Sequence, residues 1–144
     1  MAAKEYEEAL KDFRKILERD PADQFAYNNI GCVLKYQGHY EQALPYFQKA
    51  LYYMYREGKE EPNAMPLGNM AHTYELMGEY ARAAQTYKKL IDTFSDQQES
   101  LTSMKDITAN YARSNQVGKA LIVLNTYMSH HSEYLKLIYR TYVY

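Results

Sequence analysis

The stretch YEEALKDFRKILERDP, residues 6–21, returns 34 residues later as YEQALPYFQKALYYMY, residues 40–55. A third copy, YARAAQTYKKLIDTF, begins at Tyr80, and a weaker fourth, VGKALIVLNTYM, begins at Val117. Apolar residues within each copy recur three and four apart, which is the period of an amphipathic helix. A repeat of this length predicts an array of helical units that bury their apolar faces against one another.

A second apolar pattern precedes each of the last three copies, so two kinds of helix alternate, which we name A and B. Its members are Tyr27, Ile30, Gly31, Leu34 and Gly38, then Leu67, Met70, Ala71, Tyr74 and Gly78, then Met104, Ile107, Thr108, Tyr111 and Asn115. Glycine and proline are few, with six and four residues, and no alternating pattern of strands is present. The sequence therefore predicts an all-α protein.

This pattern resembles the tetratricopeptide repeat (TPR), which has an aromatic residue, a Leu-Gly pair, a later alanine followed four positions on by an aromatic, and a closing proline. The match is carried by Tyr27-x2-Ile30-Gly31 and by Gly38-x-Tyr40-x2-Ala43-x3-Phe47, with Asp20-Pro21 closing a partial repeat. The resemblance implies a right-handed superhelical solenoid of antiparallel helix pairs. The expected division is a partial repeat at 4–21, repeats at 24–58, 64–95 and 99–131, and a C-terminal helix at 133–144.

Small residues and turn residues fall at positions where the repeat needs them. Gly31, Ala43 and Ala83 stand where two helix backbones approach closely, and a larger side chain would wedge them apart. Gly38 and Gly78 lie between A and B, where a helix C-terminus favours a left-handed residue, and Asn115 substitutes for glycine in the third repeat.

Composition narrows the class of protein. The 144 residues carry 17 basic and 18 acidic side chains, a net charge of −1 that disfavours binding to nucleic acid. Cys32 is the single cysteine, and no window of about 18 to 20 apolar residues could span a membrane. We expect a cytoplasmic protein without membrane insertion.

No motif indicates catalysis. The sequence has no phosphate-binding glycine loop, nucleophile elbow or His-Glu zinc helix, and Cys32 beside Gly31 is typical of an inert, half-buried residue. The pair His130 and His131 hints at metal, but adjacent histidines on a helix point about 100 degrees apart and lack further ligands. We expect no enzyme activity, no cofactor and no metal.

In the TPR family the A helices line a concave groove, so the polar residues left over after packing are candidates for binding a peptide or partner segment. These are Asn28, Asn29, Lys35, Tyr36, Asn69, His72, Lys105, Arg113, Lys136, Tyr139 and Arg140. Asn29 and Asn69 occupy the same slot of successive repeats, and their amides suit the backbone of an extended peptide. The alternative is that both are ordinary solvated residues.

The basic residues toward the C-terminal end favour an acidic or carboxylate-bearing ligand. One family subclass clamps the C-terminal carboxylate of chaperones with lysine, asparagine and arginine side chains on three A helices. Only Asn69 matches that pattern here, and Asp106 would repel a carboxylate, so this partner class is rejected.

The 17 tyrosines exceed what the repeat needs for packing. The excess lies at Tyr52, Tyr53 and Tyr55 and in the C-terminal helix, and exposed tyrosines are typical of interfaces. Two functions therefore compete: a protein-interaction module that uses the groove, and a self-associating scaffold segment that forms a homo-oligomer through the C-terminal helix.

Overall fold

The computed structural model describes residues 2–57, 63–94 and 99–130. Those residues form α-helices joined by short turns, with no strand among them. The helices are α1 (Ala3–Arg19), α2 (Gln24–Tyr36), α3 (Tyr40–Glu57), α4 (Met65–Leu76), α5 (Tyr80–Thr93), α6 (Glu99–Arg113) and α7 (Val117–His130). The expected C-terminal helix at 133–144 lies outside the described residues.

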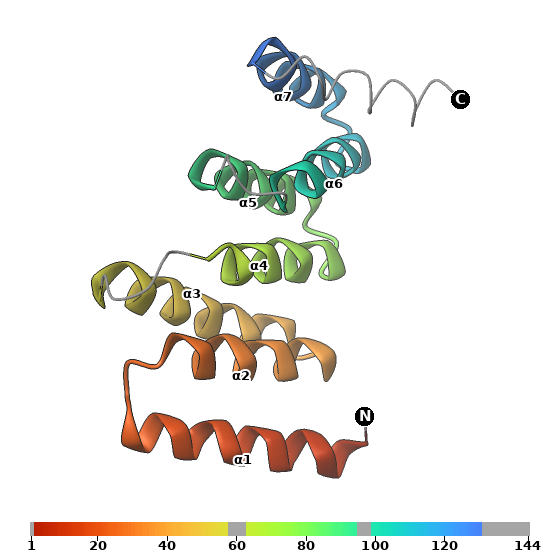
Figure 1. Ribbon diagram of the computed structural model, residues 1–144. Coiled ribbons are helices and arrows are strands. Elements are labelled where there is room, and N and C mark those ends of the chain that lie inside the picture. Colours follow the sequence, from red (N-terminus) through yellow and green to blue (C-terminus); the bar gives the residue numbers. More distant parts are fainter. Residues whose placement is uncertain (1, 58–62, 95–98, 131–144) are drawn as a thin grey trace.

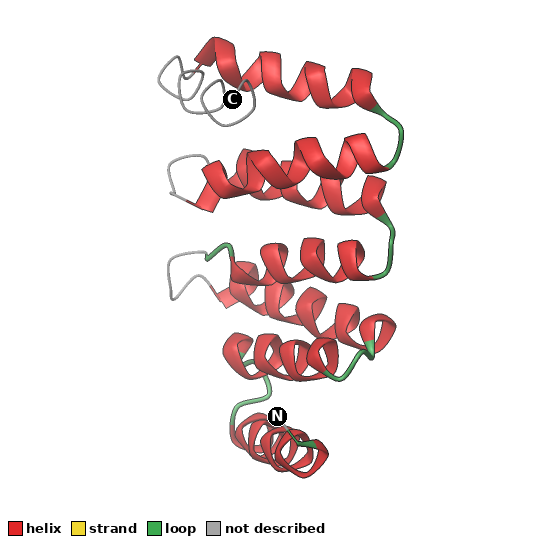
Figure 2. Ribbon diagram, turned by 90° about the vertical axis from the view of Figure 1, so that its right-hand side faces the viewer, coloured by secondary structure: helices red, strands yellow, loops and turns green. Residues whose placement is uncertain are grey.

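The helices stack in chain order, with α1 at one end of the molecule and α7 at the other (Figures 1 and 2). Each helix packs against the next one along the chain, and α2 also contacts α4 directly, although α3 separates them in the sequence. Helices α2, α4 and α6 are thus the A helices, and α1, α3, α5 and α7 the B helices. The prediction of an all-α solenoid of antiparallel helix pairs is confirmed.

Left-handed residues end the A helices, as the sequence predicts. Gly38 has φ 82°, Gly78 has φ 76° and Asn115 has φ 58°. After each, the chain folds back on the helix it has left: the backbone N–H of His39 donates to Leu34 O at 2.8 Å, with equivalent bonds after Gly78 and Asn115. These bonds satisfy carbonyls that would otherwise lack partners at the helix end.

The core lies where small residues face large ones. Phe47 is fully buried, and a Cβ added to Gly31 would come within 2.6 Å of its ring, so α2 and α3 can approach this closely only because Gly31 has no side chain. Ala43, Ala71 and Ala83 are likewise fully buried. The close approach predicted at Gly31 is confirmed, and Ala43 and Ala83, predicted at similar crossings, are buried.

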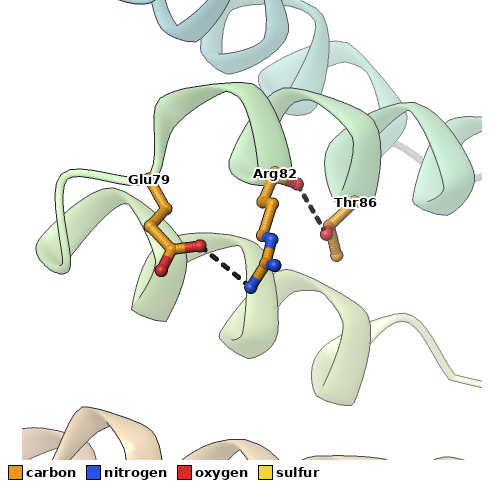
Figure 3. A network of polar contacts seen from close by, with 3 residues as sticks. All are labelled: Glu79, Arg82 and Thr86. Atoms are coloured by element: carbon orange, nitrogen blue, oxygen red, sulfur yellow. Dashed lines mark hydrogen bonds and ion pairs between the residues drawn. The ribbon is translucent and has the colours of Figure 1, made fainter.

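Polar contacts on the surface of α5 illustrate how little exposed charges contribute to the stability of the fold. Arg82 Nη1 pairs with Glu79 Oε2 at 3.1 Å, and Thr86 Oγ1 donates to the carbonyl of Arg82 at 2.8 Å (Figure 3). The side chains of Arg82 and Glu79 are 66% and 39% exposed, so the ion pair adds at most about 1 kcal/mol. Packing between helices, rather than surface charge, holds the stack together.

Candidate functional site

Two helices present matching rows of solvent-accessible side chains. On α2 the row is Phe25, Asn29, Cys32 and Tyr36, and on α4 it is Met65, Asn69, His72 and Leu76. The spacing of four, three and four residues keeps each row on one side of its helix. Each member of the first row lies 40 residues before its counterpart in the second. We name these eight residues the A-helix face.

Apolar side chains stand at both ends of the A-helix face. Phe25 is 47% exposed and Met65 52% at the N-terminal ends of their helices, while Tyr36 is 67% exposed and Leu76 45% at the C-terminal ends. The polar residues lie between them. Each row therefore has an apolar end, a polar middle and a second apolar end.

Behind this face, α2 and α4 are joined by polar side chains that we name the α2–α4 seam. Asn69 Nδ2 donates to Asn28 Oδ1 at 3.0 Å and to Cys32 Sγ at 3.3 Å. Closer to the N-terminal end of α4, Asn63 Nδ2 donates to Gln24 Oε1 at 3.4 Å. Polar groups that are half buried between two helices must be hydrogen-bonded to avoid a desolvation cost, and these amides meet that need by pairing with one another.

Lys35 is the charged member of the seam. The residue is only 6% exposed, and its Nζ lies 3.4 Å from Asn69 Oδ1 and 3.4 Å from His72 Nδ1. Nζ also sits 5.1 Å from the centroid of the Tyr36 ring. Among the described residues, no carboxylate forms an ion pair with it.

Burial shifts the protonation equilibria of the seam. It lowers the pKa of Lys35, against a smaller opposing effect of Cys32. It also lowers the pKa of His72, to which the charge of Lys35 adds, while Glu75 acts in the opposite direction. Burial raises the pKa of the Cys32 thiol, against a smaller opposing effect of Lys35, so the net shift favours the protonated thiol.

A second polar cluster joins α4 to α5 and α6. The Glu75 carboxylate accepts hydrogen bonds from Asn110 Nδ2 and from the Tyr87 hydroxyl. Burial, followed by the charges of Glu75 and Asp106, raises the pKa of Tyr87. Asn110 is fully buried, and its Oδ1 has no hydrogen-bond partner among the described residues.

The structure separates the predicted binding residues into surface and interior groups. Tyr36, His72 and Arg113 are exposed, and Asn29 and Asn69 are half buried. Asn28 and Lys35, expected at the surface, are buried, because α4 packs close enough to α2 to cover them. Lys105 belongs to α6, but its side chain is outside the described residues, as are Lys136, Tyr139 and Arg140.

Two groups of residues that look alike in the sequence have different surroundings in the structure. Asn29 and Asn69 share a repeat slot, yet Asn69 is bonded within the seam while Asn29 has no hydrogen-bond partner among the described residues. Of the clustered tyrosines, Tyr53 stacks on Tyr27 with centroids 5.4 Å apart, whereas Tyr52 and Tyr55 are 51% and 53% exposed. Both packing and exposure therefore occur in that cluster.

Sequence reasoning missed the Glu75–Asn110 pair and the lateral bonds of the seam. The sequence does contain a signal for the Glu75–Asn110 pair. Glu75 lies 40 residues after Lys35, a candidate binding residue, and so occupies the equivalent position of the next repeat. Among the described residues there is no group of three or more His, Cys, Asp and Glu side chains that could hold a metal ion. His131 and the side chain of His130 lie outside that part of the chain.

Comparison with known proteins places this arrangement among helical repeats. A tetratricopeptide repeat model matches residues 24–96, and a second one matches residues 1–23. The chain is 31% identical over 91 residues to an uncharacterized protein, ycf37, of Cyanophora paradoxa. That match covers 60% of this chain and 49% of ycf37, so the match spans about half the length of the curated relative.

Solved structures share the fold at low sequence identity. MamA, residues 41 to the end, from Desulfovibrio magneticus RS-1 superposes with a TM-score of 0.66 at 16% identity, covering 96% of this chain and 69% of that one. BtubC (BKLC) from P. vanneervenii gives 0.62 at 14% identity, covering 95% and 56%. Within the described ranges, no helix of this chain has the length and apolar character needed to cross a membrane.

Proposed function

The chain belongs to the tetratricopeptide repeat family, whose repeats form protein-interaction and scaffold modules, and we propose that it binds an extended segment of a partner protein across the A-helix face. In the family the A helices line a concave groove, and we take the A-helix face to be the equivalent surface of this chain. The proposal applies to this chain and not to a longer protein, because the match covers only about half the length of the curated relative.

The observation that supports this proposal is the repetition of exposed apolar side chains at equivalent slots. Phe25 and Met65 share one slot, and Tyr36 and Leu76 share another, and all four are at least 45% exposed. Packing of the solenoid does not require large apolar residues there. Covering them removes apolar area from water, which contributes roughly 25 cal/mol for each Å².

The polar middle of the face suits a peptide backbone. The amide of Asn29 is half buried and has no described partner, so both its donors and its acceptor are available to a backbone N–H and C=O. From Phe25 to Tyr36 the helix rises roughly 16 Å, which an extended segment of about five residues spans. The expected ligand therefore has apolar side chains about five residues apart.

A second candidate function is self-association. Val117, Leu121 and Ile122 on α7 are 54%, 54% and 66% exposed, and Tyr52 and Tyr55 on α3 are exposed as well. Exposed apolar residues of this kind can pack against a second copy of the chain. This function uses surfaces other than the A-helix face, so the two candidates can be separated by mutation.

The test is selection of binding peptides from a random displayed library. The selected peptides are then measured by fluorescence anisotropy against Tyr36→Ser and Leu76→Ser, with the exposed Tyr52→Ser on α3 as the matched control. We expect both face variants to weaken binding by about tenfold, the loss of one large apolar contact, with unchanged melting temperature. Peptides that bind both face variants as tightly as the unaltered chain would overturn the proposal.

Light scattering over a concentration series tests the second candidate. A mass that rises to a dimer, and that falls back when Ile122→Ser is introduced, would support self-association. A constant monomer mass at high micromolar concentration would exclude it.

A further inference from the structure

Within the described part of the chain, the buried lysine of the α2–α4 seam has no counter-ion. Lys35 is 6% exposed, and its Nζ makes polar contacts with an amide oxygen, Asn69 Oδ1, and an imidazole nitrogen, His72 Nδ1, each 3.4 Å away. Both distances exceed the 2.7–3.2 Å usual for hydrogen bonds of this kind. An ammonium group removed from water and held by long contacts to neutral groups is poorly compensated.

The equivalent position of the next repeat shows what a compensated charge looks like in this fold. Glu75 follows Lys35 by 40 residues, and its carboxylate accepts hydrogen bonds from Asn110 on α6 and Tyr87 on α5. Both donors are largely buried. Among the described residues, the acidic side chain at this position thus has hydrogen-bond donors, whereas the basic one has no anion.

Lys35 Nζ lies directly beneath exposed side chains of the A-helix face. Its Nζ is 5.1 Å from the centroid of the Tyr36 ring and 3.4 Å from His72 Nδ1, and both of these side chains are exposed. The other charged group that acts on His72 is Glu75, which lies on the same helix.

We propose that Lys35 is the anchor for an acidic side chain of the bound segment, whose carboxylate enters between Tyr36 and His72 and pairs with Nζ. This inference rests on the proposed function and specifies its ligand. The carboxylate supplies the missing negative charge, and the exposed apolar ends of the A-helix face contact the residues that flank the acid. The partner segment therefore carries an aspartate or glutamate between apolar side chains.

The test uses a peptide selected as described above, synthesised with both termini blocked in two forms, with its acidic residue and with the matching amide. Affinities of both forms are measured for the unaltered chain, for Lys35→Met and for Lys49→Met. Lys49 is the matched control, because it also sits over a tyrosine ring, 5.5 Å from that of Tyr27, but it is exposed and belongs to α3.

We expect the amide form to bind about tenfold more weakly to the unaltered chain and to Lys49→Met, and with less than about a twofold difference to Lys35→Met. Each comparison is between two peptides on one protein, so a change in stability cancels. Lys35→Gln serves as the second variant if Lys35→Met does not fold.

Two results would overturn the inference while leaving peptide binding intact. They are the absence of an acidic residue at a fixed position in the selected peptides, and a loss for the amide form on Lys35→Met equal to that on the unaltered chain. If no peptide is selected, or if Tyr36→Ser and Leu76→Ser both bind the peptides as tightly as the unaltered chain, the proposed function itself fails.

Discussion

Replacement of Gly31 by alanine tests the packing of α2 on α3, and replacement of Gly68 in α4 is its internal control. A Cβ on Gly31 would lie 2.6, 2.8 and 2.9 Å from three ring atoms of Phe47, which is fully buried. A Cβ on Gly68 would meet only Leu90 Cδ1, at an ordinary 3.6 Å. The same substitution is thus a clash at one site and a normal contact at the other.

The expected effects have opposite signs. Alanine is favoured over glycine inside a helix by about 1 kcal/mol, and this gain applies to both sites. At Gly31 it is outweighed by overpacking against Phe47, which costs about 1 to 3 kcal/mol. Because the helix term cancels in the comparison, Gly68→Ala should be more stable than Gly31→Ala by about 1 to 3 kcal/mol.

Urea unfolding followed by circular dichroism measures this difference, and a common m-value would show that the two variants unfold in the same way. In a thermal scan the same difference corresponds to about 2 to 4 °C for each kcal/mol. Adding Phe47→Leu to Gly31→Ala should recover part of the loss, since the two sites share one contact. If Gly31→Ala proves as stable as Gly68→Ala, the close approach of α2 and α3 is not as described.

Three further substitutions probe other parts of the structure. Burial and Lys35 hold the pKa of His72 below 6.5, so on acidification the unfolded chain takes up this proton before the folded chain does. The free energy of unfolding, fully present above about pH 6.5, should therefore fall as the pH is lowered. Between urea midpoints measured at about pH 7.5 and about pH 5.5, His72→Gln should show a smaller loss of stability than the unaltered chain. Asn115→Ala should lower the melting temperature by an amount equal to about 1 kcal/mol, because Asn115 has φ 58°, while Asn115→Gly should not. Ala83→Arg places a charge at a fully buried site and should cost at least about 3 kcal/mol in urea unfolding, whereas the exposed Gln85→Arg should stay within about 0.5 kcal/mol.

The sequence predicted those features that depend on local requirements. A left-handed turn admits few residue types, so Gly38 and Asn115 could be placed without knowing the fold. A close helix crossing needs a small residue opposite a large one, which identified Gly31 and Phe47. Because the same requirements recur in every repeat, the residues that meet them stand at corresponding positions and can be identified from the sequence.

The burial of Asn28 and Lys35 was not predictable in the same way. Both residues are polar, and the apolar period of α2 assigns them to its outer side. Their environment depends on the distance and rotation between α2 and α4, which belong to different repeats. A pattern within one helix carries no information on that relation, so the seam became apparent only in the structure.

Lys35 and Glu75 occupy equivalent positions of successive repeats but have different roles. Stacking places both residues at seams beside the A-helix face, where a charge is withdrawn from water and requires compensation. Tyr87 and Asn110 provide it for Glu75 by donating hydrogen bonds to its carboxylate. No described anion provides it for Lys35, and its long contacts to Asn69 and His72 leave a positive site beside exposed apolar groups. The energetic gain from a partner's carboxylate is consequently concentrated at this one seam, which is why specificity of binding should depend on Lys35 more than on the exposed basic residues of the surface.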